Sequence, residues 1–128
     1  MKKGINPILK GFHPDPCILR VKDDYYIATS TFQWFKGVQL YHSKDLINWE
    51  TVSYLFDEIH DTPRYDLEEG TVYGRGQWAT TIRYNNGTFW ALFVANDEPH
   101  KSMVFKTDDP AKGWTLHGRL PAYHDASL

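Results

Sequence analysis

The sequence lacks the features that indicate a disulfide scaffold, a membrane protein or a nucleic-acid-binding protein. Cys17 is the only cysteine in 128 residues, which excludes an internal disulfide and a cysteine metal cluster. No apolar run approaches the roughly 18 residues of a membrane-spanning helix. The net charge of −2 gives no indication of nucleic acid or an anionic membrane as a partner. No apolar segment of the signal-peptide type follows the two initial lysines, so we expect a cytoplasmic protein.

A sustained 3.6-residue hydrophobic period is also missing, and strand signals dominate the chain instead. Aromatic residues, which favour strands, make up 16% of the sequence. Short apolar runs separated by polar turns predict strands at residues 17–21, 25–30, 38–43, 49–52, 78–84, 88–94, 102–107 and 114–117. Residues 57–77 are polar, charged and glycine-containing, so we predict a long loop there.

The predicted strands form two similar units. Each unit has a hairpin, a third strand, a polar turn and then a tryptophan in a short outer strand. The units align with an offset of roughly 63 residues, which matches Arg20 with Arg83 and Asp45 with Asp108. Repeated units of four strands in meander order are typical of β-propeller blades, so we predict an all-β propeller. Two hairpin sheets packed as a β-sandwich are the alternative.

One short motif precedes the first strand and carries a single carboxylate between two prolines. Pro14 and Pro16 each have a fixed φ, and a proline pushes the residue before it towards an extended conformation. We therefore predict that Asp15 lies in a stiff, extended segment that leads into the strand at Cys17. Such a mounting suits a reactive acid, although a surface turn is the alternative interpretation of Pro-Asp-Pro.

The last residues of the sequence, 124–128, are similar to those around Asp15. An aspartate, Asp125, is again followed by two small residues and an apolar one. This similarity predicts that Asp125 stands at the start of the innermost strand of a third unit. Because innermost strands surround the central channel of a propeller, both carboxylates would lie at that channel. Such a pair suits proton transfer on a bound substrate.

These motifs resemble glycoside hydrolase family 43, in particular its β-xylosidase and α-L-arabinofuranosidase members. The segments that carry the resemblance are residues 11–16, 25–32, 37–49, 78–84, 86–89 and 124–128. They cover most of the chain in the order of the family. The resemblance implies a five-bladed β-propeller, of which this chain would supply two blades and the start of a third. We therefore expect residues 1–128 to be the N-terminal part of a catalytic domain, inactive in isolation.

The resemblance also implies a reaction and two catalytic residues. Family members hydrolyse glycosidic bonds with inversion: one carboxylate activates a water, and a carboxylic acid opposite protonates the leaving oxygen. By resemblance, Asp15 is the general base, and Asp125 orients the general acid and modulates its pKa. The family's general acid is a glutamate from a later blade, and no residue here matches its motif. The candidate substitutes are better explained as solvated loop charges: Glu50, Glu58, Glu68, Glu69 and Glu98.

Two aromatic residues are candidates for contact with the sugar. Phe32 matches a family position that lines the sugar pocket, with a core position as the alternative. Trp78 opens the inner strand of the second unit, at the place that Asp15 has in the first, so we predict a stacking platform there. Weaker candidates are Trp34 and Arg75, and two histidines, His13 and His124, flank the acids with a structural role as the alternative. We expect inter-blade packing for Trp49, Trp90 and Trp114. We expect Cys17 to be a buried small residue and not a nucleophile.

We predict no cofactor and no metal ligand in this chain, and the resemblance leaves open a calcium ion in the central channel. The expected partner is an oligosaccharide substrate, with no nucleic acid and no membrane, and the oligomeric state stays open. Two hypotheses of function follow. The first is a glycosidase that removes xylose or arabinose from oligosaccharides. The second is a propeller that binds carbohydrate without cleaving it, in which two carboxylates at the channel would have no evident role.

Overall fold

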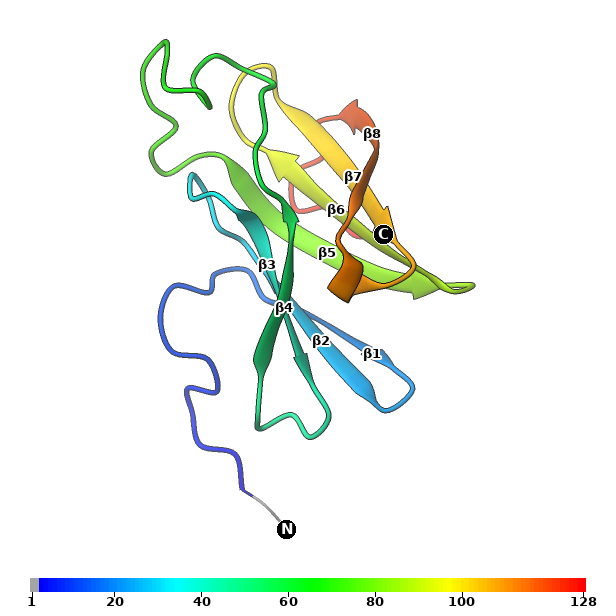
Figure 1. Ribbon diagram of the computed structural model, residues 1–128. Helices are drawn as coiled ribbons and strands as arrows, with labels where there is room; N and C mark the ends of the chain where they lie inside the picture. The colour runs from blue at the N-terminus through cyan, green and yellow to red at the C-terminus, as the bar shows by residue number, and fades with distance from the viewer. Residues whose placement is uncertain (1–2) are drawn as a thin grey trace.

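The computed structural model describes residues 3–128, which form two four-stranded antiparallel sheets (Figure 1). The first sheet contains, in order, β1 (Cys17–Val21), β2 (Asp24–Thr29), β3 (Gly37–Ser43) and β4 (Glu50–Phe56). The second contains β5 (Gln77–Asn85), β6 (Thr88–Ala95), β7 (Lys101–Thr107) and β8 (Thr115–Pro121). A short 3-10 helix, η1 (Pro110–Lys112), lies between β7 and β8. None of the residues described here belongs to a helix long and apolar enough to cross a membrane.

The eight predicted strands and the long loop between the sheets are confirmed. The main difference concerns the outer strands. β4 was predicted to end at Val52, but it continues to Phe56 because its last two side chains are buried in the core. Trp49 and Trp114 were expected inside the outer strands, yet each directly precedes one. Trp114 donates from Nε1 to Ser53 Oγ at 3.3 Å and so links the two sheets.

The two sheets repeat each other with an offset of 64 residues. Val21 pairs with Asp24 at the end of the first hairpin, and Asn85 pairs with Thr88 in the second, 64 positions later. The predicted offset of about 63 is therefore wrong by one residue, and Arg20 corresponds to Tyr84. The difference matters because side chains alternate between the faces of a strand, so a slip of one residue exchanges the faces.

The corrected alignment distinguishes a propeller from a sandwich. Ile82 of β5 is 1% exposed and packs against the first sheet, whereas its counterpart Ile18 of β1 is 58% exposed on the far face. In a sandwich made of two equivalent sheets, corresponding faces would be buried against each other. Here the face of the second sheet that carries Ile82 packs on the face of the first sheet opposite to the one that carries Ile18. Non-equivalent faces also pack on each other in adjacent propeller blades. The sandwich alternative is therefore wrong.

Three phenylalanines fill the space between the sheets. Phe56 of β4 stacks on Phe93 of β6 with ring centroids 5.3 Å apart, and Phe105 of β7 lies 5.8 Å from both. Gly37 makes room for this cluster, because a Cβ at this position would collide with the Phe56 ring. The stacked rings explain why β4 runs four residues beyond its predicted end at Val52.

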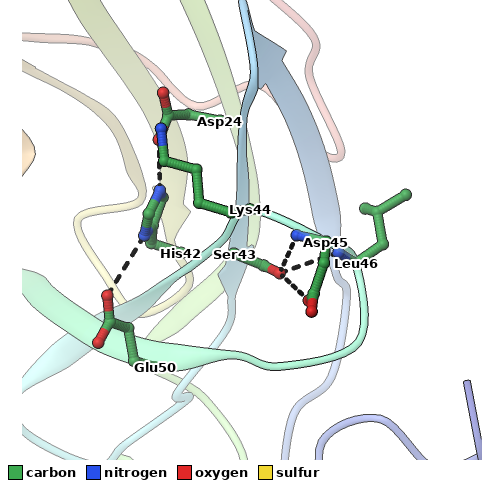
Figure 2. A network of polar contacts seen from close by, with 7 residues as sticks. All are labelled: Asp24, His42, Ser43, Lys44, Asp45, Leu46 and Glu50. Carbon is green, nitrogen blue, oxygen red and sulfur yellow. Dashed lines mark hydrogen bonds and ion pairs between the residues drawn. The ribbon is translucent and has the colours of Figure 1, made fainter. Parts of the chain in front are cut away.

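A polar turn joins β3 to β4 (Figure 2). Ser43 Oγ accepts the backbone N–H of Asp45 at 3.1 Å. The Asp45 carboxylate in turn accepts the backbone N–H groups of Asn48 at 2.8 Å and Ile47 at 2.9 Å. These bonds stabilise the ionised form and hold the pKa of Asp45 well below its ordinary value.

The second sheet has the same turn at the corrected offset. Thr107 Oγ1 accepts the N–H of Asp109 at 3.1 Å, and Asp109 Oδ1 accepts the N–H of Ala111 at 3.0 Å. Asp45 therefore corresponds to Asp109 rather than to Asp108. The repeat thus extends from the strands to the hydrogen bonds of their turns.

A surface cluster beside the first turn connects three strands (Figure 2). Asp24 Oδ1 accepts from Lys44 Nζ at 2.7 Å and from His42 Nε2 at 2.6 Å, and His42 Nδ1 lies 3.3 Å from a Glu50 carboxylate oxygen. Hydrogen bonds from Lys44 and then His42 lower the pKa of Asp24. The cluster lies at the hairpin formed by β3 and β4, and it holds the start of β2 against these two strands.

Removing one ring of the phenylalanine cluster should destabilise the protein strongly. Phe93 is 1% exposed, so Phe93→Ala should lower the free energy of unfolding by about 3–5 kcal/mol through lost burial and a residual cavity. Urea denaturation followed by tryptophan fluorescence measures this change. Tyr73 is 82% exposed, so Tyr73→Ala is the matched control and should stay within about 0.5 kcal/mol of wild type. Equal stability of the two variants would contradict the described core.

Candidate active site

Three residues near the starts of the inner strands share an unusual backbone conformation. Asp15, Ala79 and Asp125 have φ angles of 51°, 46° and 49°. Positive φ is uncommon for residues other than glycine. Ala79 lies 64 positions after Asp15, so it takes the place of Asp15 in the second unit, and the prediction that Trp78 does so is wrong by one residue. The same conformation at Asp125 favours the prediction that a third unit begins there.

Asp15 is exposed, and its backbone is fixed by the segment that precedes it. The buried Ser30 donates its N–H to the Pro14 carbonyl at 3.0 Å, which holds the motif against the end of β2. The predicted extended conformation of Asp15 is wrong, because its φ of 51° is left-handed. Aspartate tolerates this region better than most residues, but the following Pro16 disfavours it, so Asp15 carries backbone strain. Strain of this kind is concentrated at functional sites.

Asp125 is exposed as well, and its segment is anchored to the second sheet on both sides. Before it, Tyr123 donates its N–H to Ser102 Oγ at 2.8 Å. After it, Ser127 Oγ accepts from Arg83 Nη2 at 2.6 Å. His124 Nε2 lies 3.6 Å from the Asp125 carboxylate. The carboxylate is therefore held in place by its backbone and faces solvent.

Four rings form an aromatic row between the two aspartate segments: Phe12, Phe32, Trp78 and His124. The centroid distances along the row are 5.3 Å, 5.7 Å and 6.0 Å. Phe12 stands three residues before Asp15, and His124 directly precedes Asp125. The row thus brings together the two predicted sugar contacts, Phe32 and Trp78. It adds Phe12, which sequence reasoning missed although it adjoins the motif.

Gln77 connects the loop that carries Phe32 to the strand that carries Trp78. The backbone groups of Phe32 and Gln77 exchange two hydrogen bonds of 3.1 Å and 2.8 Å. The buried Gln77 side chain accepts the N–H of Thr31 at 2.9 Å and donates to Thr80 Oγ1 at 2.6 Å. No sequence signal distinguished this glutamine, because its role depends on a contact between residues that are far apart in the chain.

Trp78 and His13 differ in how far their ring nitrogens are hydrogen-bonded. Trp78 Nε1 is buried and has no hydrogen-bond partner among residues 3–128, a cost that an internal water would relieve. His13, by contrast, is fully engaged: its Nε2 donates to the Lys10 carbonyl at 3.0 Å, so its Nδ1 accepts from the Tyr41 hydroxyl at 3.0 Å. Burial raises the pKa of Tyr41 to about 12, so it remains a donor. These contacts favour the structural role for His13.

Among residues 3–128, the other residues considered from the sequence form no hydrogen bond or ion pair with the aromatic row or the two aspartates. All five glutamates considered as substitutes for the general acid are exposed, as predicted: Glu50, Glu58, Glu68, Glu69 and Glu98. Cys17 is half-buried, packs against the core and has its Sγ 4.0 Å from Thr81 Oγ1. Trp34 is 60% exposed. Within the described part of the chain, no group of three or more His, Cys, Asp or Glu side chains is placed to hold a metal ion.

Comparison with known proteins gives a consistent family. The model of the family described as glycosyl hydrolases family 43 matches residues 5–128. A xylan 1,3-β-xylosidase of a Vibrio species is 50% identical over 88 residues, which cover 69% of this chain and 16% of that protein. A non-reducing end α-L-arabinofuranosidase of Bacteroides ovatus is 42% identical over 112 residues, which cover 86% of this chain and 21% of that protein.

A solved structure shows the same arrangement of strands. It is described as a bifunctional GH43-CE protein of Bacteroides eggerthii, and it matches with a TM-score of 0.89 at 34% identity. The match covers 97% of this chain and 18% of that one. The chain therefore spans only about a fifth of the length of the proteins that it resembles.

The close approach of the loop to Phe32 gives a test of the site's geometry. A Cβ at Gly76 would collide with the Phe32 carbonyl, and Gly76 also has a φ of 87°. Gly76→Ala should therefore lower the free energy of unfolding by about 2–5 kcal/mol in a denaturation experiment. Gly74 has a φ of 72° but no atom near its Cβ position, so Gly74→Ala should cost only about 1–2 kcal/mol. Equal losses would show that the collision is absent.

Proposed function

Because the chain belongs to glycosyl hydrolase family 43, we propose that the full-length protein is an inverting glycosidase that releases xylose or arabinose from oligosaccharides. The observation that carries the proposal is the aromatic row, which spans the space between two exposed aspartates. Aromatic rings stack on the apolar faces of sugars, and carboxylates supply the proton transfers of glycoside hydrolysis. The relatives described as xylosidase and arabinofuranosidase support the substrate class.

Family membership and the similar structures also confirm the predicted fold class. The two four-stranded sheets are consecutive blades of a five-bladed β-propeller. Asp125 is proposed to stand at the start of the third blade. β1 and β5 are the first strands of their blades, and they contact each other. In such a fold the starts of the inner strands gather around one axis, which supports the proposal that residues 1–128 form part of the catalytic domain.

Asp15 is the proposed general base. Its carboxylate is exposed and makes no hydrogen bond or ion pair within residues 3–128, so its lone pairs are free to accept a proton. In the proposed step, Asp15 takes a proton from a water while the water oxygen bonds to the anomeric carbon. The bond from that carbon to the leaving oxygen breaks, and the general acid protonates this oxygen. The resemblance implies a glutamic acid for that role, and no glutamate of this chain matches its motif.

Asp125 is the proposed modulator of the general acid. A negative charge beside a carboxylic acid disfavours its ionisation and so raises its pKa. The acid then remains protonated at a pH at which Asp15 is already ionised, which the reaction requires. Phe32 and Trp78 are the proposed sugar-binding wall, with their ring centroids 5.7 Å apart.

Neutralising the proposed base tests the reaction directly. Asp15→Asn in the full-length protein should lower kcat on nitrophenyl xyloside and nitrophenyl arabinofuranoside by about 10²–10⁴-fold, because an amide cannot accept the proton of water. Asp23→Asn is the matched control, since this turn aspartate has a side chain that is 93% exposed. It should retain wild-type turnover. Undiminished turnover of Asp15→Asn would make the catalytic assignment wrong.

The pH dependence of the same enzyme tests Asp125. The alkaline limb of the profile of kcat/KM reports loss of the proton from the general acid. Asp125→Asn removes the neighbouring negative charge and should lower the pKa of that acid, so the alkaline limb should move to lower pH by about one unit. The acidic limb, which reports the base, should move much less. An alkaline limb that stays in place would refute the role of Asp125.

A further inference from the structure

A buried carboxylate outside the predicted motifs binds two arginines of the long loop between the blades. Asp97 stands two residues after the end of β6, and its side chain is 0% exposed. Its Oδ1 accepts from Arg64 Nη1 at 3.0 Å and from Arg75 Nη1 at 3.2 Å. Its Oδ2 is buried without a partner in the described residues. A buried carboxylate is tolerated only when it is paired, so Asp97 depends on these two arginines.

The contact between Asp97 and Arg75 lies one residue from the segment that positions the aromatic row. Arg75 precedes Gly76, whose carbonyl accepts the N–H of Asn96, the neighbour of Asp97, at 2.7 Å. Gly76 packs against the Phe32 carbonyl with no room for a Cβ. The next residue, Gln77, forms the two backbone hydrogen bonds to Phe32. Asp97 and Asn96 therefore clamp the end of the loop where it meets the site.

The same loop has a second anchor at its other end. Asp61 has a side chain that is 8% exposed, and it accepts two hydrogen bonds from Arg119 of β8, at 2.7 Å and 2.9 Å. Both anchors pair a loop segment with the second blade through a carboxylate and arginine. Only the Asp97 anchor adjoins the residues that hold Phe32 and Trp78. The chain thus contains its own control for effects that arise from fastening the loop in general.

We propose that Asp97 is a positioning residue that acts through Arg75 and the backbone of Gly76 and Gln77 to hold Phe32 against Trp78. It thereby sets the affinity of the aromatic row for the terminal sugar. Stability alone is a weak explanation for Asp97, because buried ion pairs contribute little net stability compared with apolar side chains. The inference rests on the proposed function in one respect: the ligand of the aromatic row is the sugar.

The test compares Asp97→Asn with Asp61→Asn in the full-length protein, with kcat and KM measured on nitrophenyl xyloside and nitrophenyl arabinofuranoside. Asparagine keeps the shape of Asp97 and one acceptor but removes the charge that holds both arginines. We expect Asp97→Asn to raise KM about 10-fold, while kcat stays within about twofold and both limbs of the pH profile stay in place. Asp61→Asn should leave KM at the wild-type value.

Three results would overturn the inference. They are an unchanged KM for Asp97→Asn, an equal rise in KM for both variants, and a fall in kcat without a change in KM. If Asp97→Asn does not fold, Arg75→Gln removes the same contact from a side chain that is 53% exposed, and it should raise KM about as much. Where both variants fold, the double variant should not exceed the single ones, because the two residues act through one contact. An unchanged KM for Arg75→Gln would again overturn the inference.

Binding of free xylose and arabinose, followed by tryptophan fluorescence, separates failure of this inference from failure of the proposed function. If the wild-type protein binds a sugar but does not hydrolyse the glycosides, the proposed function is wrong. The inference is then decided by whether Asp97→Asn raises the Kd about 10-fold relative to Asp61→Asn. If the wild-type protein hydrolyses the glycosides and Asp97→Asn is unchanged, only the inference fails. If wild type neither binds nor hydrolyses, both are overturned.

Discussion

The two backbone hydrogen bonds between Phe32 and Gln77 join the blades where both contribute to the site. They connect the loop after β2 to the first residue of β5 across 45 positions of sequence. They fix the loop residue Phe32 beside β5, which carries Trp78. The buried Gln77 side chain reinforces the connection through Thr31 and Thr80. The geometry of the aromatic row therefore depends on a contact between main chains, which is less tolerant of displacement than a contact between flexible side chains.

The stacking of the blades explains why so small a chain has a well-defined core. Each blade presents one apolar face to its neighbour. Here the face of the second blade that carries Ile82 packs on the face of the first blade that lies opposite Ile18. Phe56, Phe93 and Phe105 fill the interface, while Ile18 remains exposed on the opposite face of the first blade. Hydrophobic burial thus supplies most of the stability, and it leaves the channel ends of the inner strands free for polar groups.

The sequence predicted the strands and the existence of the repeat well, because these features depend on local patterns. Alternating apolar residues and the Asn86-Gly87 turn determine the second hairpin within a few positions. The alignment was wrong by one residue because it matched residues by type, such as Arg20 with Arg83, whereas the strand pairing gives a constant offset of 64, as Val21 with Asp24 and Asn85 with Thr88 show. The conformation of Asp15 was also missed. A proline favours an extended preceding residue, but the Ser30 bond to Pro14 and the packing of the motif override that local preference.

The contacts of Gln77 and Asp97 lay beyond sequence reasoning for a different reason. Each residue has ordinary neighbours in sequence, and its role arises only when the long loop folds back on the second blade. Phe32 is an intermediate case: family resemblance identified it, and the structure explains its position through Gln77. Residues whose importance comes from long-range contacts give no local signal, whatever the quality of the motif next to them.

The shared left-handed conformation of Asp15, Ala79 and Asp125 has a broader consequence. The repeat supplies equivalent backbone positions around one axis, yet the side chains at these positions are two carboxylates and one methyl group. The scaffold is therefore symmetric while the charge is not. A single substitution at each of these positions can change the functional group without changing the path of the main chain. Pseudosymmetry of the main chain separates the problem of placing a group from the choice of which group to place.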